Sequence, residues 1–128
     1  MLRHMAKSKI HGATVTMTEL HYEGSITLPL DLMEAADILP GERVQVVNLS
    51  NGERLETYTI AGERASTTIC LNGPAARLAV VGDRVHIISY ALYPDEEART
   101  LDVTTVRVDK HNQLIPGGSH CAAETERG

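Results

Sequence analysis

Alternating apolar and polar residues mark two early segments of the chain. The alternating apolar positions are Ala13, Val15 and Met17 in the first segment, and Ile26, Leu28 and Leu30 in the second. Because a strand points successive side chains to opposite faces, each segment predicts a β-strand with one buried face. The Gly24-Ser25 pair is therefore predicted to lie between two strands.

A short helix is predicted directly after the second segment. Asp31 followed by Glu34 is typical of a helix start, and the Pro40-Gly41 pair ends the helical pattern. The spacing of the apolar residues predicts one apolar helical face. Its members are Leu32, Ala35, Ala36 and Leu39.

A hairpin is predicted in the middle of the chain. Asn51-Gly52 is a strong turn signal because both residues tolerate a positive φ, and strand-like segments 44–49 and 55–60 flank the turn. The second arm therefore carries Arg54, Thr57 and Tyr58. Two more strands are predicted, in residues 67–71 before Asn72-Gly73, and around Val103, Val106 and Val108.

Residues 39–47 and 80–88 repeat one pattern. Each begins with apolar residues, continues through a turn into Gly-acid-Arg, and ends in an apolar strand. The repeat indicates a duplicated β-rich unit with approximate two-fold symmetry. The alternative is that Gly-Asp and Gly-Glu turns before strands are common and unrelated.

The composition favours one β-rich domain with a modest core. The chain has 128 residues, of which 42% are hydrophobic, and it lacks Phe and Trp. Aliphatic side chains must fill the core, and their β-branched members favour strands. We expect one domain over residues 1–108 and a mobile tail over residues 109–128. A small core also makes association with other copies plausible.

Charge and motif content exclude several functions. The net charge of −5 argues against a general nucleic-acid binder and means that an anionic substrate needs a local cationic pocket. The histidines lack metal-ligand spacing, so no metal site is expected. Cys70 and Cys121 make no disulfide framework. No signal-peptide core and no segment of about 20 apolar residues occurs, so we expect a cytoplasmic protein with no membrane partner.

The Gly24-Ser25 pair carries the most informative candidate chemistry. A serine hydroxyl can attack the preceding carbonyl and convert the amide into an ester. Elimination of that ester leaves dehydroalanine at position 25, which hydrolyses to ammonia and an N-terminal pyruvoyl group. This cleavage would divide the chain into residues 1–24 and 25–128. The alternative is that Gly-Ser is simply a turn dipeptide.

Seven segments resemble the pyruvoyl-dependent aspartate 1-decarboxylase family, in register from the N-terminus to about position 99. They are Lys9-Ile10-His11, Leu20-His21-Tyr22-Glu23-Gly24-Ser25, Asn51-Gly52-Glu53-Arg54, Thr57-Tyr58, Asn72-Gly73, Val81-Gly82-Asp83 and Pro94-Asp95-Glu96-Glu97-Ala98-Arg99. The resemblance implies a mainly β double-psi β-barrel with short helices. It also implies a homotetramer with active sites between subunits, which converts L-aspartate to β-alanine for pantothenate and coenzyme A synthesis. A maturation factor stays an open question.

The same resemblance implies roles in cleavage and catalysis. Ser25 is the precursor of the pyruvoyl cofactor, which forms a Schiff base with the substrate amine and accepts the electrons released with carbon dioxide. Thr57 is implied to activate the Gly24 carbonyl during cleavage. Tyr58 is implied to donate the proton that follows decarboxylation. Without the resemblance, Tyr58 is more simply half-buried packing.

Substrate binding is implied for a second group of residues. The planar guanidinium of Arg54 suits a carboxylate bidentately, and Lys9 would add to the positive field. Read alone, both are ordinary surface residues. The resemblance also places these residues around the substrate or the cleavage site: Thr57, Asn72, Gly73, Pro74 and Ala75, with His11, His21 and Tyr22 beside them.

Two positions depart from the family pattern. Pro74 stands where alanine is usual and cannot donate a backbone N–H, and Val47 replaces a Trp found in some members. Pocket shape is therefore the property most affected. The rival interpretation is a non-catalytic β-barrel that binds a ligand or partner and is not processed.

Overall fold

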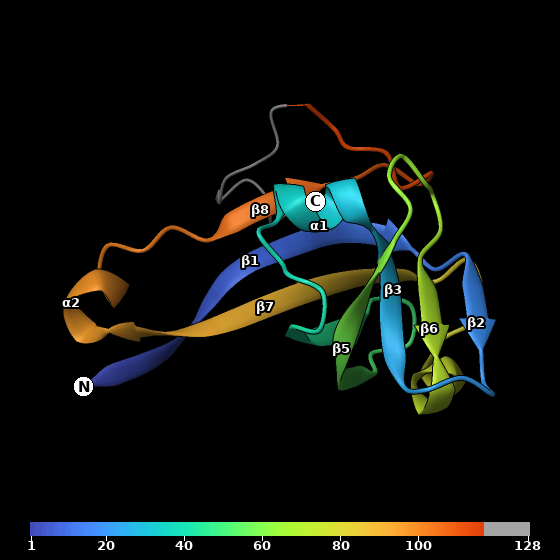
Figure 1. The fold of residues 1–128 in the computed structure, drawn as a ribbon, viewed down its shortest axis with the longest axis horizontal. Helices are drawn as coiled ribbons and strands as arrows, with labels where there is room; N and C mark the ends of the chain where they lie inside the picture. Colours follow the sequence, from blue (N-terminus) through green and yellow to red (C-terminus); the bar gives the residue numbers. More distant parts are fainter. Residues whose placement is uncertain (117–128) are drawn as a thin grey trace.

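The computed structural model describes residues 1–116, and these form a mainly β structure (Figure 1). Residues 117–128, which include most of the predicted tail and Cys121, lie outside the described range. The elements in chain order are β1 (Leu2–Thr14), β2 (Met17–Glu19), β3 (Ser25–Pro29), α1 (Leu30–Ala35), β4 (Arg43–Asn48), β5 (Arg54–Gly62), β6 (Cys70–Asn72), η1 (Gly73–Leu78), β7 (Arg84–Pro94), α2 (Asp95–Ala98) and β8 (Thr104–Arg107).

The eight strands of residues 1–116 belong to one mixed sheet in the order β2-β6-β3-β5-β4-β7-β1-β8. The parallel pairs are β2/β6, β3/β5 and β1/β8, and the other neighbours are antiparallel. The predicted hairpin is confirmed as β4 and β5, with Gly52 at φ 81° in its turn. This architecture with short helices confirms the predicted fold class and agrees with a double-psi β-barrel.

The core is aliphatic, as the composition predicts. Its largest fully buried side chains are Ile10, Val15, Ile26, Leu28, Leu32, Met33, Val44, Val46, Ile69, Leu71, Val85 and Ile87. Alternation along β3 and β4 directs Ile26, Leu28, Val44 and Val46 into this core. Met17 breaks the predicted pattern, since it is 47% exposed on the short strand β2.

The helix α1 differs from its prediction. It ends at Ala35 because Asp37 adopts φ 56°, and the N–H groups of Asp37 and Ile38 close a C-terminal turn on the carbonyls of Glu34 and Met33. Leu39, predicted on the apolar face, is consequently 68% exposed, and Ala35 is also exposed. The buried residues after the helix start are Leu32, Met33, Ala36 and Ile38.

The predicted internal repeat corresponds to two turns that are built alike. In the first, Glu42 accepts a hydrogen bond from the Leu39 N–H (2.9 Å), and in the second Asp83 accepts one from the Val80 N–H (3.0 Å). A glycine with positive φ precedes each acid, at 85° for Gly41 and 101° for Gly82. The strands that follow, β4 and β7, pair antiparallel.

The backbone of each turn also makes two hydrogen bonds to one residue of another segment. Gly41 N–H donates to the Thr59 carbonyl (2.8 Å), and Thr59 N–H donates to the Glu42 carbonyl (3.1 Å). Gly82 and Asp83 bind Val15 in the same way, at 2.8 and 2.9 Å. The repeated sequence pattern therefore produces the same pair of backbone hydrogen bonds at two places in the fold.

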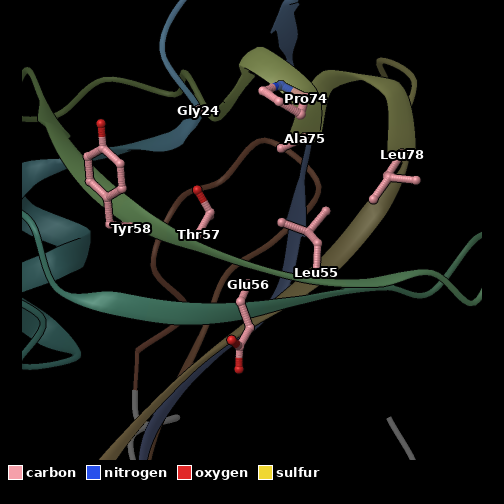
Figure 2. A pocket seen from close by; sticks show the side chains of 8 residues that line it. All are labelled: Gly24, Leu55, Glu56, Thr57, Tyr58, Pro74, Ala75 and Leu78. Carbon is pink, nitrogen blue, oxygen red and sulfur yellow. The ribbon is translucent and has the colours of Figure 1, made fainter.

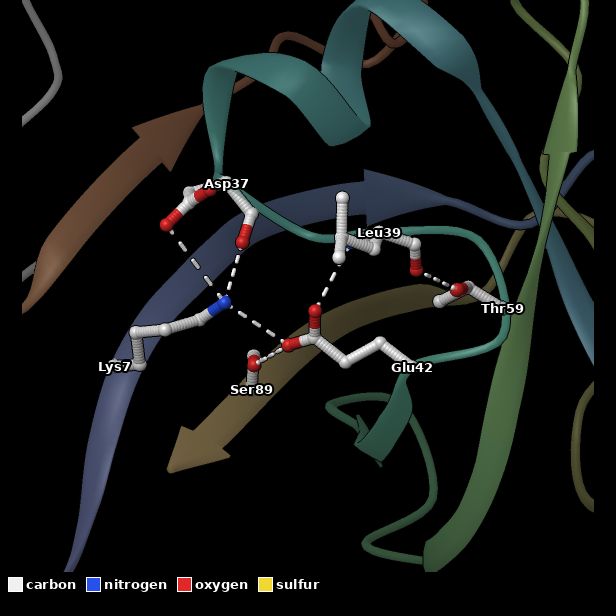
Figure 3. A network of polar contacts seen from close by, with 6 residues as sticks. All are labelled: Lys7, Asp37, Leu39, Glu42, Thr59 and Ser89. Carbon is white, nitrogen blue, oxygen red and sulfur yellow. Dashed lines mark hydrogen bonds and ion pairs between the residues drawn. The ribbon is translucent and has the colours of Figure 1, made fainter. Parts of the chain in front are cut away.

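A partly buried polar network fixes the first of these turns (Figure 3). The Lys7 ammonium lies 3.0 Å from a Glu42 carboxylate oxygen, the Ser89 hydroxyl donates to the same oxygen, and the Lys7 ammonium also binds the Asp37 carbonyl. Burial would raise the pKa of Glu42, but the hydrogen bonds from Ser89, Leu39 and Lys7 outweigh burial and lower it. The network joins β1 and β7 to the turn that holds β5.

Residues 109–116, predicted as the start of the tail, are anchored to the domain by Asn112. This side chain is 5% exposed; its carbonyl oxygen accepts from the Thr14 N–H (2.7 Å), and its amide nitrogen donates to the Thr14 and Thr67 carbonyls (2.9 Å each). The polar composition suggested a tail, whereas buried hydrogen bonds hold this part of the chain in place.

Glu42→Gln is expected to lower the free energy of unfolding at pH 7 by about 1–3 kcal/mol, because it removes charge-assisted hydrogen bonds from a largely buried carboxylate. The folded-state pKa of Glu42 is depressed, so this contribution is present above the ordinary glutamate pKa and is lost as pH falls through the folded value. Denaturant titrations of wild type and variant at matched concentration should converge at low pH.

Glu34→Gln is the matched control for this stability measurement. Its carboxylate is bound bidentately by Arg64 at 2.7 Å on the surface, with a side-chain exposure of 54%, so solvent screens the pair. The unfolding midpoint should barely change. An equal loss of unfolding free energy in both variants would show that the Glu42 network contributes no more to stability than the exposed Glu34–Arg64 pair.

Candidate active site

Ser25 is the first residue of β3 and is fully buried. Its hydroxyl donates to the Glu23 carbonyl at 3.2 Å and accepts a hydrogen bond from the Asn72 amide nitrogen at 2.9 Å. The Gly24-Ser25 pair lies after β2 and at the start of β3, as the alternating pattern predicts. The buried Ser25 hydroxyl therefore donates one hydrogen bond and accepts one, and it lies next to the Gly24 carbonyl.

A close backbone contact brings η1 onto the segment before Ser25. A Cβ added to Gly73 would lie 2.7 Å from both the Gly24 nitrogen and the Tyr22 carbonyl oxygen, and Gly73 has φ +65°. Only glycine fits this position without displacement of the backbone. The close approach of Gly73 thus also seats Pro74 beside Gly24.

A pocket of about 380 Å³ opens next to Gly24 (Figure 2). Its walls come from Gly24, from β5 and from η1. The lining residues are Gly24, Leu55, Glu56, Thr57, Tyr58, Pro74, Ala75 and Leu78. Five of the residues singled out in the sequence thus share one pocket: Gly24, Thr57, Tyr58, Pro74 and Ala75.

Thr57 and Tyr58 both border this pocket although they are consecutive in β5. The pairing of β5 with β4 runs in unbroken register, with Val44 opposite Thr57 and Arg43 opposite Tyr58, so no bulge is required. Figure 2 shows the Thr57 hydroxyl directed toward Gly24 and the Tyr58 ring at the edge of the pocket, while Glu56 points away. Tyr58 is 38% exposed, in keeping with a place at the rim.

Pro74 fits the backbone at this position. It lies in the first turn of η1, where a missing N–H leaves no helical hydrogen bond unmade. Its ring stands 3.4 Å from the position that a Cβ on Gly24 would occupy. The departure from alanine at position 74 therefore adds an apolar ring to the wall of the pocket.

Several predicted residues do not meet Ser25 within one chain. Arg54 is exposed at the start of β5, opposite Val47, and makes no ion pair within residues 1–116. Lys9 and His11 lie on β1, and the sheet places β5, β4 and β7 between β1 and β3. His21 and Tyr22 are exposed before Gly24.

Lys9 and His11 instead join a basic cluster that the sequence does not reveal. The His11 and His86 rings lie 4.1 Å apart between centroids. Burial, followed by the positive charges of His11, Lys9 and Arg107, lowers the pKa of His86 to about 4. His86 is therefore neutral at physiological pH. Strand register across β1, β7 and β8 creates this cluster, and no local spacing signals it.

The hydrogen-bond partners of Asn72 include two residues that sequence reasoning missed, Thr27 and Cys70. Asn72 donates to Thr27 (3.1 Å) as well as to Ser25, and it accepts a hydrogen bond from the Cys70 thiol (3.2 Å). Pairing between β3 and β6 brings these side chains together. A correct strand pairing would have been needed to find them, because the sequence alone does not give the partner of a strand.

Residues 1–116 offer neither a metal-binding cluster nor a membrane-spanning helix. This part of the chain contains no group of three or more His, Cys, Asp or Glu side chains that could hold a metal ion. None of its helices has the length and apolar character needed to cross a membrane.

Comparison with known proteins agrees with this site. Residues 1–115 match the family model described as aspartate decarboxylase. The aspartate 1-decarboxylase of Desulfitobacterium hafniense is 58% identical over 115 residues, covering 90% of this chain and 91% of the relative. That of Thermoanaerobacter pseudethanolicus is 57% identical over 115 residues, covering 90% and 98%. The chain therefore belongs to the aspartate decarboxylase family.

Proposed function

We propose that this protein cleaves itself between Gly24 and Ser25 and then decarboxylates L-aspartate at the α-carboxylate, giving β-alanine and carbon dioxide. One observation carries the proposal. The Ser25 hydroxyl is fully buried, held by Asn72 and Glu23, and adjoins a pocket that also contains Gly24, Thr57 and Tyr58. Family membership supports the substrate, since the matched relatives are named aspartate 1-decarboxylases.

Self-cleavage uses only groups of this chain and water. The Ser25 oxygen attacks the Gly24 carbonyl carbon, and the proton of the hydroxyl passes to the departing amide nitrogen, which becomes the amine of residue 25. Loss of the Cα proton then expels the Gly24 carboxylate and leaves dehydroalanine. Water replaces the nitrogen of dehydroalanine as ammonia departs. Thr57, whose hydroxyl points toward Gly24 in Figure 2, would polarise the carbonyl.

The residues around position 25 suit a small ketone at that place. The site is buried, and its immediate partners are the neutral amide of Asn72 and a backbone carbonyl. Asn72, Gly73 and the η1 wall would hold the group. A pyruvoyl ketone there supplies an electron sink for the electrons released when carbon dioxide leaves the substrate. Tyr58, at the rim, would deliver a proton from its hydroxyl to the substrate carbon.

Substrate carboxylates require positive groups, and the proposal assigns them to Arg54 and Lys9. These residues do not converge on Ser25 within one chain, so the complete site would form between subunits of a homo-oligomer, with a tetramer as the expected assembly. Exposed apolar side chains are available for such contacts, among them Leu2 and Leu92 at 61% and 60% exposure. The product would feed pantothenate and coenzyme A synthesis in the cytoplasm.

Ser25→Ala is expected to abolish both fragmentation and decarboxylase activity, because alanine has no oxygen to accept the acyl group. Ser25→Cys should retain cleavage, since a thiol can accept it. Denaturing electrophoresis and intact mass measurement distinguish fragments 1–24 and 25–128 from the whole chain. Ser66→Ala, which removes an exposed hydroxyl bound to Thr68, is the control that should cleave normally. Cleavage of Ser25→Ala at residue 25 would refute the chemistry.

Arg54→Ala is expected to cleave itself yet lose most turnover. Loss of a charge-assisted pair with a substrate carboxylate costs on the order of 2 kcal/mol, or roughly thirtyfold in kcat/KM. Arg64→Ala serves as control, because Arg64 is paired with Glu34 on the surface. Aspartate kinetics equal to wild type in Arg54→Ala would remove this residue from the binding site.

Tyr58→Phe keeps the ring and deletes only the hydroxyl. We expect normal fragmentation and normal aspartate binding with slow turnover, because the carbon that loses carbon dioxide is no longer protonated correctly. Mass spectrometry of fragment 25–128 during turnover should show gradual conversion of its N-terminus to an alanine-type end. Tyr90→Phe, which loses a hydroxyl bound to Gln45, is the control. Full and lasting activity of Tyr58→Phe would assign the proton to another donor.

A further inference from the structure

Four polar side chains form a square on one face of two paired strands. Antiparallel pairing sets Ser25 opposite Asn72 and Thr27 opposite Cys70. Since alternate residues share a face of the sheet, these four side chains lie together, while Ile26 and Leu71 between them are fully buried on the opposite face. Ser25 therefore has three polar neighbours whose positions are fixed by strand register.

Hydrogen bonds within this square run through the Asn72 carboxamide. Its nitrogen donates to Ser25 Oγ (2.9 Å) and to Thr27 Oγ1 (3.1 Å), and its oxygen accepts from Cys70 Sγ (3.2 Å). Asn72 is 3% exposed and Cys70 is 6% exposed. Both ends of the amide thus depend on protein partners.

The thiol distinguishes the two orientations of this amide. A hydroxyl can either donate or accept a hydrogen bond, so Ser25 and Thr27 tolerate either end of the carboxamide. A thiol sulfur is a weak acceptor, so a reversed amide would leave its N–H groups facing sulfur with poor bonds. Burial, and secondarily the Glu19 carboxylate, raises the pKa of Cys70, which keeps the thiol protonated as a donor.

We propose that Cys70 is a positioning residue for self-cleavage, because its thiol hydrogen bond holds the Asn72 carboxamide with the nitrogen directed at Ser25 Oγ. The inference rests on the proposed cleavage at Gly24-Ser25. In this orientation the Ser25 proton is directed to the Glu23 carbonyl, and a lone pair stays free to attack the Gly24 carbonyl carbon. The amide N–H also stabilises the oxygen as its proton leaves. A reversed amide would draw the Ser25 proton toward the Asn72 oxygen and withdraw this donor.

The test compares Cys70→Ser with Cys70→Ala in the full chain. Both variants lose the sulfur, but only serine keeps a donor. We expect Cys70→Ser to convert to fragments 1–24 and 25–128 at a rate between those of wild type and Cys70→Ala, because its hydroxyl can donate to the Asn72 oxygen but can also accept from a reversed amide. Cys70→Ala should be slower than Cys70→Ser by about fivefold, the size expected for the loss of one buried hydrogen bond. Time courses of intact mass after purification measure both rates.

Repeating the comparison in Asn72→Ala chains separates a positioning role of Cys70 from a packing role. In Asn72→Ala chains, which lack the carboxamide, the serine and alanine variants at position 70 should cleave at the same slow rate, because no amide remains to be oriented. Cys70→Thr and Cys70→Val form an isosteric pair that gives the same contrast if the smaller residues unfold the chain. Thermal melting of each variant confirms that folded proteins are compared.

The outcomes separate this inference from the proposed function. A wild-type chain that never fragments overturns both. If wild type fragments while the donor and non-donor variants cleave at equal rates, only the positioning role of Cys70 is overturned. A serine-to-alanine difference that persists in the Asn72→Ala background also overturns it, because the effect would then not pass through the amide. A rate difference confined to chains with Asn72 supports it.

Discussion

The register of β3 between β5 and β6 is the constraint on which the candidate site depends. β3 pairs with β6 so that Ser25 faces Asn72, and with β5 so that Ile26 faces Thr59. A slip of one residue would take Ser25 off the face that carries Asn72 and expel Ile26 from the core. Burial of Ile26 and Leu28 therefore fixes the register, and the polar contacts of Ser25 follow from it. Gly73 completes the site, because only a residue without Cβ lets η1 approach Gly24 this closely.

The two Gly-acid turns explain how so small a core holds long strands in place. In each turn a carboxylate accepts a hydrogen bond from the turn's own backbone. The backbone of each turn is also hydrogen-bonded to one residue of another segment, Thr59 in the first turn and Val15 in the second. Thr59 is the residue after Tyr58, so the turn stabilised by Glu42 and Lys7 also sets the strand that lines the pocket. Stability and site geometry are thus linked through one polar network.

Charge is distributed unevenly around the site. The chain carries a net charge of −5, yet Lys9, His11, His86 and Arg107 gather on β1, β7 and β8, where burial and then the neighbouring positive charges lower the pKa of His86 and keep it neutral. Ser25 itself is surrounded by neutral groups, which suits chemistry on an amide bond. Within one chain, Ser25 and this cationic cluster therefore occupy separate regions of a single sheet.

The sequence by itself determined the β class, the hairpin at Asn51-Gly52, the repeated turns and the placement of Gly24-Ser25 between two strands, because these depend on local alternation and turn chemistry. Its resemblance to a known family also indicated Thr57 and Tyr58 as candidate site residues. Only the tertiary structure decided that Asn72 links Ser25 to Thr27 and Cys70, that Arg54 and Lys9 lie apart from Ser25, and that Asn112 anchors residues 109–116. Those contacts join residues distant in the chain, and local patterns do not specify which strands pair or in which register.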